Sequence, residues 1–174
     1  MVAQLNPHSI EAERLILGQA MVDNSVIDQI AQYIPEETVF YDMKHQHIWK
    51  SILSLHREGA QVIDPITVVA QIPKDAVEEP NYYLTGLTSD VHTTANAEHY
   101  AKVVYEKWLL RKVIIQSKKI TRVMDMDGDG AHHALQRMNR EIEDILNLRI
   151  RQDFDLDNLL SNTIRDITVT DNIV

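Results

Sequence analysis

The sequence contains no cysteine, which excludes disulfides and cysteine-based zinc sites. Glycine and proline number only five each in 174 residues, which favours a helical chain over a loop-rich β protein. No apolar run approaches the roughly 20 residues of a membrane-spanning helix, and no signal peptide is visible. With 44% hydrophobic residues, the chain is expected to be folded and all-α, and its composition fits a reducing cytoplasm.

The common motifs of catalysis are missing as well. There is no G-x-x-x-x-G-K-[ST] phosphate loop, no G-x-S-x-G nucleophile elbow and no H-E-x-x-H zinc helix. Without a cysteine nucleophile either, no active site can be identified, so we expect this chain alone to be neither an enzyme nor a cofactor-binding protein.

Charge is distributed unevenly. Residues 1–100 carry a net charge of −9, residues 101–151 carry +4 and residues 152–174 carry −4, which together give −9. The basic stretch lacks interleaved exposed aromatics and alternates with acids, so we expect a solvated helix face and little direct DNA binding. Its cations are Lys107, Arg111, Lys112, Lys118, Lys119 and Arg122.

Caps and apolar periodicity predict a series of helices. Ser9 is expected to cap the first, and Ser25 to open the second in an S-x-x-D capping box. The third should run over residues 42–58, with Gly59 ending it and His45 as a hydrogen-bonded structural residue on its inner face. The others are expected from Asp64 to Pro73, over 82–87 and over about 94–124. Ile48, Trp49, Ile52, Leu55 and Trp108 are predicted core residues.

A hairpin and a terminal helix are expected after the head. The Asp- and Gly-rich run 125–130 should break the long helix, and the helix after it has an a/d seam that we expect to be an oligomer interface. The seam is Leu135, Met138, Ile142 and Ile145. A short amphipathic helix follows, with Leu156, Leu160, Ile164 and Ile167 on its apolar face. The predicted organisation is a globular head (1–92), a helical hairpin (93–148) and a linker (149–174).

Two apparent metal motifs are weak. Residues 125–130 fit the first half of an EF-hand loop, but Gln136 stands where the bidentate Glu should be, so we expect a solvent-exposed turn without calcium. His45-Gln46-His47 and His132-His133 lack zinc-site spacing, and we expect no metal site.

Six segments, in order, resemble the N-terminal domain and linker of bacterial replicative DNA helicases, the DnaB family. The first reads NPHSIEAERLILG at 6–18, and later ones include HQHI at 45–48, IDPIT at 63–67 and NAEHYA at 96–101. The segments are 6–18, 40–48, 59–67, 83–84, 96–111 and 153–167. One departure is the loop before Tyr83, where the family has paired glycines and this chain has none.

The resemblance implies a ring. In that family hairpins pair between subunits and heads contact heads, giving a trimer of dimers that recruits primase. Motif matching places Glu11, Tyr83, Ile114 and Ile120 on the primase-facing surface, although Ile114 and Ile120 also fit the hairpin core. The linker helix should dock on the motor domain of the adjacent subunit, where ATP and Mg²⁺ would bind, and a helicase loader is another possible partner.

Since no phosphate loop precedes Val174, we expect a fragment of such a helicase that serves assembly and partner docking. One alternative is a stand-alone motorless homologue that regulates helicase rings. Another is a nucleotide- or metal-dependent enzyme of unrecognised type. A Walker A motif downstream would separate the first two.

Overall fold

A computed structural model describes residues 6–126, 133, 135–136, 139–140 and 143, and it describes no side chains at 119–126. Its ordered elements in this part of the chain are all helical, which confirms the all-α prediction there. They are α1 (Ile10–Val22), η1 (Asn24–Val26), α2 (Ile27–Tyr33), η2 (Glu37–Val39), α3 (Met43–Arg57), α4 (Pro65–Gln71), α5 (Pro80–Ser89) and α6 (Ala97–Met126). Within these residues, no helix is both long enough and apolar enough to cross a membrane.

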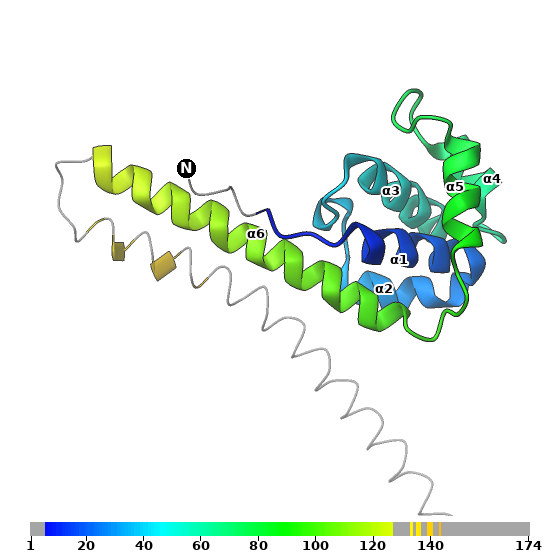
Figure 1. Cartoon of the computed structure of the whole chain (residues 1–174), viewed down its shortest axis with the longest axis horizontal. Coiled ribbons are helices and arrows are strands. Elements are labelled where there is room, and N and C mark those ends of the chain that lie inside the picture. The colour runs from blue at the N-terminus through cyan, green and yellow to red at the C-terminus, as the bar shows by residue number, and fades with distance from the viewer. Residues whose placement is uncertain (1–5, 127–132, 134, 137–138, 141–142, 144–174) are drawn as a thin grey trace, which may run out of the picture. The chain divides into compact units, whose positions relative to one another are not determined.

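The chain divides into two compact units, Met1–Arg111 and Lys112–Val174. In the first unit α1 packs against α3 and α5, and α4 packs against the same two helices (Figure 1). The predicted core residues of α3 and Trp108 are buried, as expected. The largest fully buried side chains are Ile16, Leu17, Ile27, Ile30, Ile34, Phe40, Ile48, Trp49, Ile52, Ile63, Leu84 and Leu87.

The first turns of α6 belong to this unit, because Ala97, Ala101 and Val104 are buried in it. In the second unit, α6 continues from Lys112 to Met126, and the described residues beyond it are helical. The helix therefore extends through Asp125, where we expected the break to begin. The division into head, hairpin and linker remains a prediction, since the linker and most of the second arm lie outside the described residues.

The starts of α1, α3 and α4 lie where the sequence predicted them, and local hydrogen bonds fix all three. The side chains of Ser9, Asp42 and Asp64 accept hydrogen bonds from backbone N–H groups in the first turns of α1, α3 and α4. Asp64 forms a full capping box with Thr67, and backbone hydrogen bonds lower the pKa of its carboxyl. Gly59 follows the C-cap of α3 with φ 73°, as predicted for a C′ glycine.

The predicted capping box at Ser25 is wrong. Asp23 accepts from both the backbone N–H and the hydroxyl of Ser25, and this arrangement makes the 3₁₀ turn η1 in front of α2. Asp28 instead accepts from His56 on α3. Ser25 lies inside this 3₁₀ turn, and the N-cap of α2 is Val26, whose side chain makes no cap hydrogen bond.

The loop before α5 explains how the chain manages without the family's glycines. Glu79 has φ 44° and ψ 58°, a left-handed conformation that glycine usually supplies. Pro80 then begins α5, where its fixed φ suits the first helical position. The helix thus starts two residues earlier than predicted and places Tyr82 and Tyr83 in its first turn.

Candidate functional site

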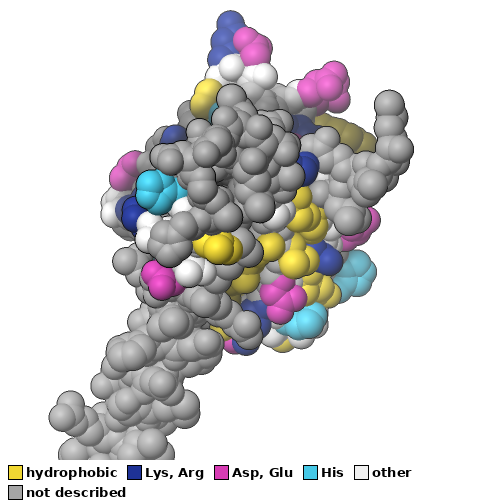
Figure 2. Space-filling model, turned by 90° about the vertical axis from the view of Figure 1, so that its left-hand side faces the viewer, with side chains coloured by type: hydrophobic (Ala, Val, Ile, Leu, Met, Phe, Trp, Pro, Cys, Tyr) yellow, Lys and Arg dark blue, Asp and Glu magenta, His cyan; other side chains and the backbone are white. Residues whose placement is uncertain are grey.

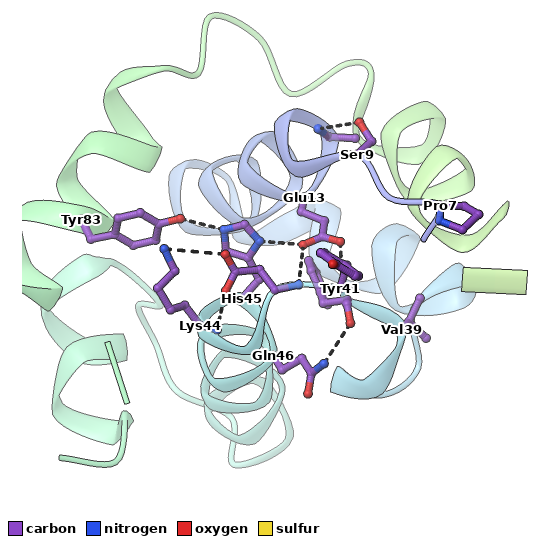
Figure 3. Close-up of polar contacts among 12 residues, drawn as sticks. Pro7, Ser9, Glu13, Val39, Tyr41, Lys44, His45, Gln46 and Tyr83 are labelled. Carbon is purple, nitrogen blue, oxygen red and sulfur yellow. Dashed lines mark hydrogen bonds and ion pairs between the residues drawn. The ribbon is translucent and has the colours of Figure 1, made fainter. Parts of the chain in front are cut away.

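A line of buried polar side chains joins α1, α3 and α5 (Figure 3). The His45 ring on α3 lies between Glu13 on α1 and Tyr83 on α5. Its Nδ1 is 2.7 Å from Glu13 Oε2, and its Nε2 is 2.7 Å from the Tyr83 hydroxyl. His45 is fully buried and Glu13 is 1% exposed, so these contacts are shielded from water. His45 is hydrogen-bonded, as predicted.

The Glu13 carboxylate also holds the start of α3. Its Oε1 accepts from the backbone N–H of Tyr41 at 2.7 Å, and its Oε2 accepts from that of Asp42 at 3.3 Å. A buried carboxylate with these donors on both oxygens is well satisfied as an ion. Glu13 therefore fixes the entry of α3 and the His45 ring together.

Two cations lie over the ring of Tyr83. Lys44 Nζ is 4.7 Å and Arg14 Cζ is 5.6 Å from the ring centroid, within cation–π range. Arg14 also pairs with Asp90 at 2.7 Å, and this hydrogen bond raises the pKa of its guanidinium. The ring is thus held by α1 and α3 as well as by its own helix.

A shallow hollow of about 400 Å³ adjoins this ring. Tyr82, the neighbour of Tyr83, is 80% exposed beside it. The lining comes from α1, α5 and the residue after α5: Arg14, Tyr82, Tyr83, Thr85, Gly86, Ser89 and Asp90. With aromatic rings, an Arg and hydroxyls around an open hollow, this face suits docking of a protein side chain better than catalysis.

On another part of the first unit, Arg111 is turned inward. Its guanidinium donates to the carbonyl oxygens of Pro7 and Val39 and lies over the Tyr41 ring. Burial lowers the pKa of Arg111, and the charge of Glu13 offsets part of this effect. Arg111 thus joins the backbone at Pro7 to the backbone at Val39. It is therefore not part of the solvated basic face that we predicted for α6.

The predicted primase-facing residues fall in both compact units. Glu11 is exposed in the first turn of α1, and Tyr83 is half-buried on α5, which packs against α1. Ile114 is half-buried in the second unit, and Ile120 is helical there without a described side chain. The first unit therefore brings together the two helices that carry Glu11 and Tyr83. That all four residues share one primase-facing surface remains a prediction.

Of the predicted seam, the structure describes Leu135, which is helical and 58% exposed. Leu110, Val113 and Ile115 on α6 are exposed too. Hydrophobic side chains also gather on the face in Figure 2, bordered by charged and His side chains. The remaining seam and linker residues lie outside the described part: Met138, Ile142, Ile145, Leu156, Leu160, Ile164 and Ile167.

Sequence reasoning missed the roles of Glu13 and Tyr83 in the buried line. A Glu in the first turn of a helix normally faces solvent and interacts favourably with the helix dipole, so its position in the sequence does not indicate burial. The available signal was His45, since a His on an inner helix face needs hydrogen-bonding partners.

The sequence model described as "DnaB-like helicase N terminal domain" matches residues 5–106. The chain belongs to this DnaB family. A crystal structure of the N-terminal domain of DnaB helicase from Mycobacterium tuberculosis is similar, with a TM-score of 0.71 and 27% identity. The match covers 80% of this chain and 99% of that one. The match is to the non-catalytic part of the helicase; the full-length DnaB protein is the enzyme.

Curated proteins of the DnaB family are also similar to this chain in sequence. The replicative DNA helicase DnaC of Bacillus subtilis is 37% identical over 115 residues, which are 64% of this chain and 25% of that protein. DnaB of Geobacillus stearothermophilus is 32% identical over 146 residues, which are 82% of this chain and 32% of that protein. The chain thus spans about a third or less of these relatives, which belong to an oligomer-forming helicase family.

Proposed function

We propose that this DnaB-family domain is the assembly and partner-docking part of a hexameric replicative DNA helicase. It supports ring formation as a trimer of dimers and recruits primase at the replication fork, in the cytoplasm. The observation that carries the assembly role is the exposure of Leu110, Val113 and Ile115 on α6, at 48%, 43% and 51%.

These side chains lie on more than one side of the helix. Leu110 and Val113 are three residues apart and share a face, whereas Ile115 lies about 200° around the helix from Val113. Exposed apolar surface of this kind is uncommon on monomers and is typical of interfaces. A second copy of the hairpin supplies a matching apolar partner through Leu135 and the rest of the seam.

The docking role rests on α1 and α5. The hollow beside Tyr83 gives primase a rigid aromatic contact, with Glu11 exposed on α1. The linker helix docks through Leu156, Leu160, Ile164 and Ile167 on the motor domain of the adjacent subunit, which binds ATP and Mg²⁺. A helicase loader is a further partner of the assembled ring, and direct DNA contact is small.

The assembly role is tested with two Asp substitutions on the second arm of the hairpin. Ile142→Asp would place a charge in the seam, where burial without a partner is costly. Asn139→Asp is the matched control, because Asn139 is exposed and helical. In sedimentation velocity we expect Asn139→Asp to assemble like the unchanged chain and Ile142→Asp to dissociate. Equal assembly of both variants would exclude the seam as the interface.

A further inference from the structure

The buried line Glu13–His45–Tyr83 ends at the proposed docking surface, and the protons in it can be assigned. Glu13 accepts backbone N–H donors on both oxygens, so it is the acceptor for His45 as well. The proton between them therefore belongs to Nδ1 of His45. The other ring nitrogen, Nε2, is hydrogen-bonded to the Tyr83 hydroxyl.

This arrangement fixes Tyr83 at both ends. The hydroxyl is anchored inside the head, while Lys44 and Arg14 lie over the ring. The His45 and Tyr83 rings are also stacked, with centroids 6.1 Å apart and planes 22° apart. Tyr82, one residue earlier, extends into solvent with 80% of its surface exposed. Of the two neighbouring aromatics, Tyr83 is the one held in a single orientation.

We propose that His45 and Glu13 are positioning residues for partner docking: they hold the Tyr83 ring at the hollow in the orientation that the partner binds. This inference rests on the proposed function, in which primase docks at Tyr83. Holding the side chain in advance removes the entropy cost of ordering it on binding. A partner therefore gains affinity from His45 without touching it.

Two substitutions of His45 separate positioning from simple support of the fold. The amide nitrogen of Asn lies near the place of Nδ1, so His45→Asn keeps a donor for Glu13 and cannot reach Tyr83. The longer Gln places its amide near Nε2, so His45→Gln keeps a partner for Tyr83 and loses Glu13. His45→Gln loses the buried bond to the Glu13 carboxylate, so in urea unfolding it should be the less stable variant; His45→Asn loses only the partly buried bond to Tyr83.

Affinity for a purified bacterial primase should distinguish the two variants. We expect His45→Asn to weaken binding by up to about tenfold, the entropy cost of ordering one side chain on binding, and His45→Gln to weaken it less than about threefold. When Tyr83→Ala is also present, the two His45 substitutions should have equal affinities, because His45 acts only through Tyr83.

A second measurement needs no partner. Scalar couplings of the tyrosine side chains in the free 174-residue chain report whether χ1 is fixed or averaged. We expect Tyr83 to be fixed in the unchanged chain and in His45→Gln, and averaged in His45→Asn, with Tyr82 averaged in all three. A fixed Tyr83 in His45→Asn would overturn the positioning role whatever primase does.

The binding results distinguish failure of the positioning role from failure of docking at Tyr83. If Tyr83→Ala weakens primase binding while His45→Asn and His45→Gln weaken it equally, docking stands and positioning is overturned. If Tyr83→Ala leaves primase binding unchanged, docking at Tyr83 is overturned, and the role of His45 in docking is overturned with it.

Discussion

Arg111 on α6 donates from Nη2 to the carbonyl oxygen of Val39, at 2.6 Å, although 72 residues separate them. Its Nη1 donates to the carbonyl oxygen of Pro7 at 2.8 Å. One guanidinium thus ties α6 to the segment before α1 and to the end of η2. The planar, forked guanidinium offers a separate nitrogen to each carbonyl group.

Removing this guanidinium should loosen the first unit. Arg111→Leu leaves two partly buried carbonyl groups without their donor, and we expect it to lower the free energy of unfolding by about 2 kcal/mol. Arg111→Lys should lose about half as much, since an ammonium can reach one carbonyl well. Lys118→Ala, at an exposed site on the same helix, should change it by less than about 0.5 kcal/mol. Urea unfolding tests this, and an Arg111→Leu variant as stable as Lys118→Ala would contradict it.

The crossing of α1 and α5 depends on Gly18. A Cβ added to Gly18 would lie 2.3 Å from the carbonyl oxygen of Leu87 and 2.8 Å from Val91 Cγ2. Gly18→Ala must push the helices apart, and we expect a loss of about 2 kcal/mol or more, despite the better helix propensity of Ala.

Gly86 on α5 is the matched control, because a Cβ there would meet nothing within 4 Å. Gly86→Ala should stabilise the chain by up to about 1 kcal/mol. In urea unfolding, we expect Gly18→Ala to lower the free energy of unfolding and Gly86→Ala to raise it. If both substitutions changed it in the same direction, the packing at Gly18 would be looser than described.

The cap of α4 should depend on pH. Hydrogen bonds from Thr67 lower the pKa of Asp64 below its ordinary 3.8. A carboxyl with a lowered folded pKa contributes fully above its unfolded pKa, and the contribution is lost as pH falls through the folded value. Asp64→Ala should cost about 1 kcal/mol near neutral pH, and Asp64→Asn only a few tenths, since Asn also caps.

Denaturant titrations near pH 7 and near pH 3 provide the measurement. The difference in the free energy of unfolding between the unchanged chain and Asp64→Asn should be smaller at the lower pH, where the carboxylate of Asp64 begins to be protonated. A difference that grows as pH falls would mean that the neutral acid is the favoured form in the fold.

Sequence predicted best what local chemistry decides. Ser9 and Asp64 cap their helices as predicted, because each accepts from a backbone N–H group three residues later. The apolar face of α3 was also predictable, since the helical period alone places Ile48 and Ile52 inward.

Prediction failed where a partner came from elsewhere. The expected capping box at Ser25 does not form, because Asp23 caps a 3₁₀ turn that contains Ser25, and α2 begins only at Ile27. Glu13 is buried because Tyr41 and Asp42, just before α3, bring backbone donors to it and α3 brings His45. These partners are about 30 residues away in the sequence, so no local pattern predicts them. Resemblance supplied Tyr83 as a candidate, and the structure supplied the contacts that hold it.

The central claim is that this DnaB-family domain assembles with copies of itself. The most direct measurement is the mass of the unchanged 174-residue chain by sedimentation equilibrium over a wide concentration range. Dimers that convert to hexamers as concentration rises are the expected result, with the proposed pairing of hairpins preceding contacts between heads. A single species of 20.0 kDa at every concentration would contradict the account.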